Sequence, residues 1–162
     1  MGKVSLIAAV DSRGAIGYRG GLLFRLPDDM KRFRLLTTGH TVLMGRRTFE
    51  SLPHGALPHR RNIVVSRSLT PCPGAEVYGS IDEALRACHD DEVYVIGGGS
   101  VYAQTLALAD ELCLTEVDAT APDADTFFPT VSDSDWTLIG EEHHPADERH
   151  AYPFRFTTYV RR

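Results

Sequence analysis

The sequence predicts an α/β fold in which a mostly parallel sheet is flanked by helices. Strand-like apolar runs alternate with helical patterns along the first two thirds of the chain, as in parallel strands joined by helices. Such a sheet is covered on both faces, which accounts for the nearly continuous apolar character of the runs. In chain order we expect strands at residues 4–10, 41–44, 62–65, 76–78 and 93–96.

The last third of the chain is expected to complete this sheet. A glycine-rich turn at 97–99 precedes a helix at 101–108, followed by strand candidates at 111–117, 136–142 and 154–160. No long helix separates the last two candidates, so an antiparallel hairpin should close the parallel sheet. Because no repeat, low-complexity stretch or long linker divides the chain, residues 1–162 are predicted to form a single domain.

The composition is that of an ordinary globular protein. The chain has 162 residues, 43% of them hydrophobic, which suffices for a sizeable core. Cys72, Cys88 and Cys113 lack the C-x-x-C spacing and the histidines lack the H-x-x-x-H spacing, so we expect free thiols and no metal. Only three residues precede the first apolar run, and no stretch approaches the roughly 18 apolar residues of a membrane span. A cytoplasmic protein without a membrane partner is expected.

The charge is distributed unevenly between the two parts of the chain. Residues 1–67 hold twelve Lys or Arg against four acids, a balance of +8, whereas residues 68–162 hold five against eighteen, a balance of −13. The basic residues form short clusters at the ends of predicted elements, which favours local anion pockets over a nucleic-acid track. Several arginines should nevertheless be solvated, and Arg32, Arg61 and Arg86 are the candidates.

One acidic residue lies on the apolar side of a predicted helix. Pro27 suits the first helical position, and the helix should run to about Leu36 before Gly39 ends it. At helical spacing Asp29 shares a face with Phe33 and Leu36. A carboxylate among apolar side chains is costly unless donors or a cation meet it, so a ligand with N–H groups is indicated.

The neighbouring acid has a different expected role. Asp28 points the same way as Arg32 and is expected to be a surface salt-bridge partner. The alternative is that Asp28 and Asp29 merely complement the helix dipole.

Three strand ends carry features of anion binding. Residues 94–102 are a buried strand, a run of glycines and a helix start, which presents backbone N–H groups to an anion. Residues 43–51 repeat this pattern with two arginines beside a glycine, and residues 64–68 end a strand with hydroxyls and an arginine. At one sheet edge the three could bind a long polyphosphate ligand. The alternative is that the glycines only relieve crowding, and the usual G-x-G-x-x-G fingerprint is absent because Tyr102 stands at its last position.

These residues carry a resemblance to the bacterial dihydrofolate reductases that extends over the whole chain. Each motif is weak alone, but their joint order and spacing are specific. The matching stretches are Ser5-Leu6-Ile7-Ala8-Ala9-Val10, Ile16-Gly17, Leu26-Pro27-Asp28-Asp29, Met44-Gly45-Arg46-Arg47-Thr48-Phe49-Glu50-Ser51, Leu57-Pro58-His59-Arg60-Arg61-Asn62, Val95-Ile96-Gly97-Gly98-Gly99 and Asp125-Thr126-Phe127-Phe128-Pro129. The resemblance implies an eight-stranded, mostly parallel sheet with an antiparallel C-terminal strand and four flanking helices.

The resemblance also implies an activity, the NADPH-dependent reduction of 7,8-dihydrofolate to tetrahydrofolate in one-carbon metabolism. Hydride would move to the pterin, with a proton added at the adjacent ring nitrogen. Asp29 matches the pterin-binding acid, Thr115 the threonine that supports it, and Arg60 the partner of the substrate's glutamate carboxylate. Diaminopyrimidine or pteridine antifolates are expected inhibitors, and a monomer is expected. The implied substrate-binding residues are Ile7, Ala8, Ala9, Asp29, Met30, Phe33, Leu52, Leu57, Arg60, Ile96, Tyr102 and Thr115.

For NADPH, the resemblance implies a set of residues at the three strand ends and around the nicotinamide. In this family the Gly97–Gly98 peptide is cis, and residues 16–24 match a mobile loop that closes over the nicotinamide. Leu22 and Phe24 in that loop join Asp29 and Thr115 as the catalytic candidates. The implied cofactor-binding residues are Ala9, Ile16, Gly20, Gly21, Leu22, Gly45, Arg46, Arg47, Thr48, Val65, Ser66, Arg67, Ile96, Gly98, Gly99, Ser100, Val101, Tyr102, Gln104 and Thr126.

The chain departs from the family pattern at two places. Leu23-Phe24 replaces the Pro-Trp of many relatives, so the indole N–H that can hold an active-site water is missing. Ser100 replaces an arginine found in some relatives, and Arg67 is a candidate to compensate. Two other functions stay open on the sequence: an NADPH-dependent reductase of another heterocycle, such as a pyrimidine, and a non-catalytic nucleotide-binding module.

Overall fold

An eight-stranded sheet forms the centre of the protein. The computed structural model describes residues 2–18, 21–22 and 26–162. The strands lie side by side in the order β10-β11-β8-β1-β7-β4-β5-β6. Their bounds are Val4–Val10 for β1, Thr41–Gly45 for β4, Arg61–Val65 for β5, Glu76–Tyr78 for β6, Val93–Gly97 for β7, Glu111–Val117 for β8, Trp136–His144 for β10 and Phe154–Arg161 for β11.

The strand directions confirm the predicted sheet. Strands β8, β1, β7, β4, β5 and β6 pair in parallel. Strand β11 is antiparallel to both β8 and β10, so the chain closes with the expected hairpin. Every strand expected in this sheet is present, and the observed bounds differ from the expected ones by at most two residues.

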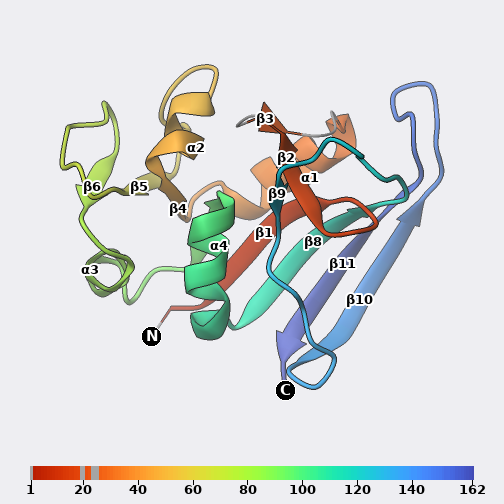
Figure 1. Ribbon diagram of the computed structural model, residues 1–162. Coiled ribbons are helices and arrows are strands. Elements are labelled where there is room, and N and C mark those ends of the chain that lie inside the picture. The colour runs from red at the N-terminus through yellow and green to blue at the C-terminus, as the bar shows by residue number, and fades with distance from the viewer. Residues whose placement is uncertain (1, 19–20, 23–25) are drawn as a thin grey trace.

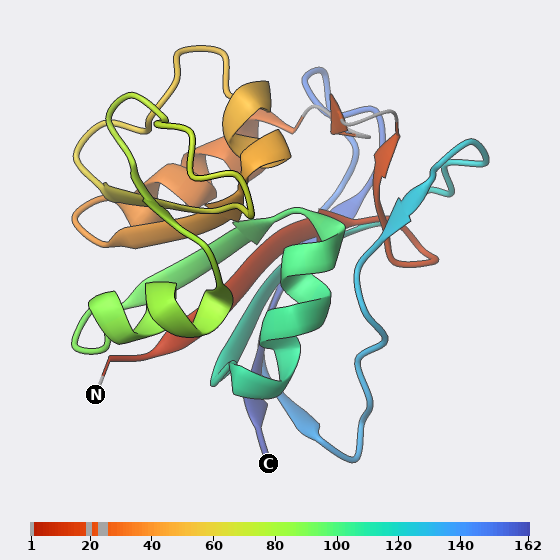
Figure 2. The same cartoon turned by 60° about the vertical axis from the view of Figure 1, so that its left-hand side comes forward.

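Helices cover both faces of the sheet, as Figures 1 and 2 show. In the described residues, α1 (Pro27–Thr37) lies on one face, and α3 (Ile81–Ala87) and α4 (Gly99–Thr105) lie on the other. The short helix α2 (Arg46–Ser51) follows β4 directly. The helix expected at 101–108 begins two residues earlier and ends as a 3₁₀ turn at Leu106–Leu108. None of these helices is long and apolar enough to cross a membrane.

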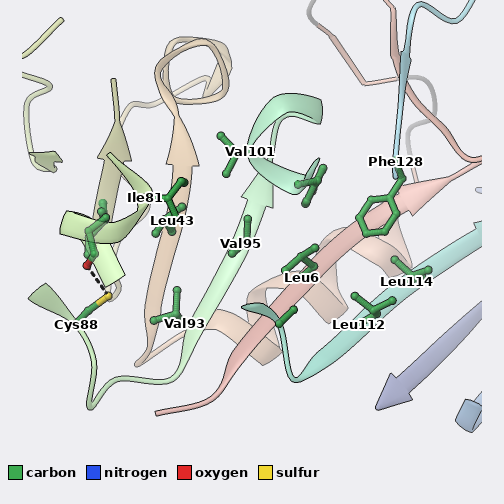
Figure 3. Packing of buried hydrophobic residues seen from close by; sticks show 14 of the residues in the cluster. Leu6, Leu43, Ile81, Cys88, Val93, Val95, Val101, Leu112, Leu114 and Phe128 are labelled. Atoms are coloured by element: carbon green, nitrogen blue, oxygen red, sulfur yellow. Dashed lines mark hydrogen bonds between the residues drawn. The ribbon is translucent and has the colours of Figure 1, made fainter. Parts of the chain in front are cut away.

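Alternate residues of the strands point to opposite faces of the sheet and form two hydrophobic cores. Leu6, Leu43 and Val95 point to the face of α3 and α4, where they pack with Ile81 and Val101 (Figure 3). Their chain neighbours point the other way and pack with Phe33 of α1 and Phe49 of α2; they are Ile7, Val42, Met44 and Tyr94. This two-sided burial explains why the strands read as continuous apolar runs. Cys88 and the other two cysteines are free, as expected, and all three are buried.

A second, three-stranded sheet was not predicted from the sequence. It has the order β3-β2-β9 and consists of β2 (Ala15–Tyr18), β3 (Gly21–Leu22) and β9 (Thr126–Phe127). Both pairings are antiparallel, and β9 brings a distant part of the chain against the loop after β1. Strands of two to four residues give no readable apolar alternation, so the sequence pattern could not indicate them.

Candidate active site

Three strand ends meet at one edge of the large sheet. Strands β7, β4 and β5 are parallel neighbours, so their carboxyl ends lie next to one another. The glycine run follows β7, Gly45 and Arg46 end β4 and begin α2, and Ser66 follows β5. The strand order therefore places the three predicted junctions side by side. Crevices outside the carboxyl ends of strands are where open α/β sheets bind ligands.

The glycine turn after β7 is shaped by close backbone approaches. The Gly97–Gly98 peptide bond is cis, as the resemblance implied, and Gly97 has φ +122°. A Cβ on Gly99 would lie 2.7 Å from Thr126 Cγ2, so only glycine fits where β9 passes the turn. A Cβ on Gly98 would lie 3.5 Å from Thr48 Oγ1, on the neighbouring junction. The turn thus brings Gly98, Gly99, Thr48 and Thr126 together as predicted.

Arg46 connects two of the junctions. Its Nε donates to Ser66 Oγ at 3.1 Å, and its Nη2 donates to the carbonyls of Ser68 and Thr70. Arg47 and Arg67 are exposed, and neither forms an ion pair with a carboxylate within the described part of the chain. Two unneutralised guanidinium groups beside a hydroxyl-rich strand end favour a phosphate ligand.

The remaining predicted cofactor residues lie around these junctions. Val65 is the last residue of β5, and Val101 is a buried residue of α4. Ser100 is exposed, and its Oγ accepts a hydrogen bond from Gln104 Nε2 at 3.0 Å. Ile16 lies in β2 and packs partly buried against the core on the α3 and α4 face.

Asp29 lies in the first turn of α1 and is only partly buried. Thr115 of β8 donates its hydroxyl proton to Asp29 Oδ1, and Thr115 itself is 1% exposed. Burial raises the pKa of the Asp29 carboxyl, while the Thr115 hydrogen bond and the charge of Arg32 act to lower it. The second carboxylate oxygen has no hydrogen-bond partner among the described residues. Asp29 can therefore accept N–H donors from a ligand.

Most of the predicted apolar wall forms one cluster on the α1 face of the sheet. Ile7, Phe33, Leu52, Leu57 and Ile96 belong to one hydrophobic cluster under α1 and α2. Ala8 and Ala9 are half-buried on β1, and Ala9 pairs with Thr115 in the sheet.

Two predicted wall residues lie outside this cluster. Met30 is 57% exposed. Tyr102 is buried behind β1, where its hydroxyl donates to the Ile7 carbonyl at 2.6 Å. Burial and the nearby Asp29 charge raise the pKa of Tyr102, so its hydroxyl stays neutral.

Arg60 lies at the other end of α1. Its Nη1 donates to Thr37 Oγ1 at 3.1 Å and its Nε to the Pro58 carbonyl at 2.9 Å. Burial lowers the pKa of Arg60, and repulsion by Arg34 lowers it further. No carboxylate pairs with Arg60 or Arg34 among the residues that the structure describes. At 1.5 Å per helical residue, Thr37 lies about 12 Å from Asp29 along α1, so the site suits an elongated ligand with N–H groups at one end and a carboxylate at the other.

Asp11 was not singled out from the sequence, although it anchors the loop after β1 at the same sheet edge. It is 3% exposed. Its carboxylate accepts the N–H groups of Arg13, Ala15 and Ala121, each at 2.8 Å. Burial alone would raise the pKa of Asp11, but these N–H groups and the charge of Arg13 lower it overall. An Asp before a glycine-containing turn is the only sequence signal for such a role.

Three expectations about charged side chains need correction or completion. Arg32 is only partly exposed and is engaged by the protein: its Nη1 donates to the Leu114 carbonyl at 3.1 Å and its guanidinium lies over the Phe156 ring. Arg61 is also only partly exposed, and it pairs with Glu76 and Asp91. Both were misjudged because their partners are distant in sequence. Arg86 is exposed, as expected.

Asp28 forms a salt bridge as predicted, but with a different partner. Its Oδ1 lies 3.0 Å from Arg149 Nη2 in the loop between β10 and β11. Helical spacing had indicated Arg32, four residues along α1. The true partner could not be found from local periodicity because it lies 121 residues away.

The loop candidates fall partly outside the structure's description. Gly20 and Phe24 lie outside the described residues, as does Leu23. Gly21 and Leu22 are described only as strand β3, paired with β2. The catalytic assignments of Leu22 and Phe24 stay predictions.

The fold and the site are those of an α/β protein whose three adjoining strand ends suit a phosphate-bearing ligand, and whose Asp29 and Arg60 suit the two ends of a second, elongated ligand. Comparisons with known proteins give this class its family. A family model described as dihydrofolate reductase matches residues 3–161. The chain belongs to the dihydrofolate reductase family.

Individual relatives match along nearly their whole length. The type 3 dihydrofolate reductase of Salmonella typhimurium is 42% identical over 160 residues, which cover 98% of each chain. The dihydrofolate reductase of Haemophilus influenzae is 40% identical over 159 residues, again 98% of each chain. Among solved structures, Enterococcus faecalis dihydrofolate reductase complexed with NADP(H) and RAB-propyl superposes with a TM-score of 0.91 at 31% identity, covering 98% of this chain and 96% of that one.

Proposed function

We propose that Asp29 and Arg60 bind the two ends of dihydrofolate while the three strand-end junctions bind NADPH. The protein is an NADPH-dependent dihydrofolate reductase: it reduces 7,8-dihydrofolate to 5,6,7,8-tetrahydrofolate. The observation that carries the residue assignment is that, among the described residues, one oxygen of the Asp29 carboxylate has no hydrogen-bond partner and Arg60, bonded to Thr37 at the far end of α1, has no carboxylate partner.

Asp29 acts on the pterin by accepting hydrogen bonds. Its carboxylate is acceptor-only when ionised and suits a ring N–H and an adjacent amino group, which it would hold with charge-assisted bonds. Thr115 fixes Oδ1 and leaves the other oxygen for the ligand. The proton for the ring nitrogen comes from water, so Asp29 orients the pterin and stabilises positive charge as that nitrogen is protonated.

The junction residues fit the cofactor. A Cβ on Gly99 would meet Thr126 of β9, and the backbone N–H groups of this glycine run would face the ligand. Arg46 holds the loop at 66–70 in place, and Arg47 and Arg67 are available for the pyrophosphate and the 2′-phosphate. NADPH supplies the hydride when it is bound. Ala9, Ile16 and Ile96 would line the nicotinamide end and exclude water.

The same proposal extends to properties that follow from this role. The chain works as a monomeric single domain in the cytoplasm, where its three free, buried cysteines suit a reducing compartment. It takes diaminopyrimidine or pteridine antifolates, whose protonated ring would pair with Asp29. It does not bind nucleic acid, because its unpaired cations form separate clusters. Light scattering with and without an antifolate, and a nucleic-acid gel shift, would test these statements.

One assay tests the function and the central residue together. NADPH oxidation is followed at its near-ultraviolet absorbance with dihydrofolate, with a pyrimidine substrate and with no second substrate. The parent protein should oxidise NADPH with dihydrofolate alone. Asp29→Asn should lose this activity while keeping NADPH affinity, and Asp28→Asn, the matched change one residue earlier, should lose far less. Equal activity of the two variants would remove Asp29 from the site.

A further inference from the structure

Helix α1 begins without a cap of its own. The residue before it is Leu26, whose side chain makes no capping hydrogen bond and is 3% exposed. The first N–H groups of a helix have no partner within it, and a Ser, Thr, Asp or Asn at this position would satisfy one of them. Asp29 lies in this uncapped turn. The groups that accept hydrogen bonds from the free N–H groups of the turn therefore help to fix the position of Asp29.

A histidine from the other end of the chain takes the capping role. The His150 side chain is fully buried in the loop between β10 and β11, and its Nε2 lies 3.3 Å from the backbone nitrogen of Asp28. A backbone N–H can only donate, so Nε2 is the unprotonated acceptor of a neutral imidazole. Its ring proton then lies on Nδ1, which donates to Asp147 Oδ1 at 2.9 Å.

Asp147 and the surrounding loop hold this ring in one orientation. The same Asp147 oxygen accepts the backbone N–H groups of His150 at 2.8 Å and Arg149 at 2.9 Å. These contacts lower the pKa of Asp147, the His150 hydrogen bond most strongly. On its apolar side the imidazole packs on the Phe154 ring of β11 at 4.9 Å.

Two further contacts join the same loop and strand to the start of α1. Leu26 packs with Phe154 and Val117 in a small separate hydrophobic cluster. The Asp28 side chain pairs with Arg149, the residue before His150. The charged groups facing the imidazole are therefore Asp147 and the Asp28–Arg149 pair. Of the three contacts, namely the His150 cap, the Leu26 packing and the Asp28–Arg149 ion pair, only the cap involves the backbone of the helix.

We propose that His150 is a positioning residue for the reaction: its neutral imidazole caps α1 from across the chain and holds Asp29 against Thr115. The inference rests on the proposed role of Asp29. Loss of the acceptor leaves the Asp28 N–H unsatisfied beside the residue that must meet the pterin, so the first turn can shift. A displacement of about 1 Å in a catalytic group can cost as much as a hundredfold in rate.

Two isosteric substitutions separate the cap from the rest of the ring. His150→Gln places an amide oxygen where Nε2 lies and so keeps an acceptor for Asp28. His150→Asn reaches only the Nδ1 position, so it can keep the Asp147 contact but not the cap. His144→Asn is the matched control. His144, the last residue of β10, stacks on the same Phe154 ring with 5.0 Å between the ring centroids.

Amide hydrogen exchange at Asp28 is measured for each protein by NMR, together with kcat, KM for dihydrofolate and the NADPH dissociation constant, well below every unfolding midpoint. We expect His150→Asn to lose Asp28 protection and to lose about ten- to a hundredfold in kcat/KM, with NADPH affinity unchanged. His150→Gln should recover most of both properties, and His144→Asn should match the parent.

The proposal requires kcat/KM to follow Asp28 protection across the series. A His150→Asn protein with an unprotected Asp28 amide and parental kcat/KM would overturn it, as would one in which the amide stays protected. A loss of NADPH affinity equal to the loss of kcat/KM would show general damage and would overturn it too. Asp29→Asn, assayed alongside, tests the proposed function separately, because parental activity in that variant would refute the role of Asp29 whatever His150 does.

Discussion

Arg60 is held to α1 by Thr37, whose Oγ1 accepts from Arg60 Nη1 at 3.1 Å and donates to the Phe33 carbonyl at 2.8 Å. The hydroxyl thus links the guanidinium to the helix that also carries Asp29. The distance between the two proposed binding ends is therefore set by one helix, α1. Ligands recognised at both ends must match the length of α1 between them.

The first prediction concerns this end of the site. Arg60→Leu should weaken dihydrofolate binding by roughly ten- to a hundredfold, because charged hydrogen bonds contribute about 1.5–3 kcal/mol. A small diaminopyrimidine without a glutamate tail should bind almost as before. Titration calorimetry with both ligands measures the difference, with Arg86→Leu as a control for loss of one positive charge. Equal losses for the two ligands would mean that Arg60 acts through the fold.

The second prediction concerns the choice of cofactor. Arg67 is exposed beside Ser66, where Arg46 is already engaged, so Arg67 is a cation that could meet a 2′-phosphate at this strand end. The parent should prefer NADPH to NADH, and Arg67→Ala should reduce this preference by about tenfold, the equivalent of one charge-assisted bond of ~1.4 kcal/mol. The measure is the ratio of kcat/KM values for the two cofactors, with Arg86→Ala as the control. A parent that uses both cofactors equally would refute the assignment.

The third prediction concerns Asp11, whose carboxylate joins the loop after β1 to Ala121. In Asp11→Asn an amide nitrogen, which can only donate, replaces one of the two carboxylate oxygens. It would then face a backbone N–H group, which is also a donor. The free energy of unfolding should fall by about 1–3 kcal/mol, the cost of an unsatisfied buried donor. Urea unfolding at neutral pH measures it, and Asp118→Asn, an exposed acid in the partner loop, is the control. Equal free energies of unfolding for Asp11→Asn and Asp118→Asn would contradict this prediction.

The sign of the Asp11 effect with pH follows from its lowered pKa. A carboxyl group with a lower pKa in the folded protein stabilises the fold above its unfolded pKa of about 3.9. This contribution is lost as the pH falls through the folded pKa. The stability difference between the parent and Asp11→Asn should therefore shrink at acid pH.

The sequence was sufficient for the large sheet and for the kind of site because both depend on local patterns. Apolar runs located the strands, and the glycine run and Asp29 indicated where the ligands are proposed to bind. It could not give His150 or Asp147, because a capping contact between residues 28 and 150 leaves no trace in periodicity. The role of Asp11 could not be predicted for the same reason, since its partner Ala121 is 110 residues away. Contacts that orient a site are made by loops that the fold brings together.

The last prediction concerns Asp29 and pH. Burial raises the pKa of this carboxyl in the folded protein. A raised pKa means that the protonated form is favoured by folding, so the ionised carboxylate destabilises the fold as the pH rises through that pKa. Asp29→Asn keeps the shape and can still accept the Thr115 hydrogen bond without the charge. At neutral pH the variant should therefore be at least as stable as the parent, and this advantage should disappear below the unfolded pKa of about 3.9.

Activity should change in the opposite direction. Asp29→Asn should lose about a hundredfold or more in turnover at neutral pH, because a pterin N–H loses its charged acceptor. Its residual rate should rise as the pH is lowered, more steeply than that of the parent, since the substrate must be protonated from solution. Thermal unfolding and pH–rate profiles of both proteins provide the measurements. Near-parental turnover at neutral pH would place the pterin elsewhere, and a clear loss of stability at that pH would mean that the ionised carboxylate is fully compensated in the unliganded fold.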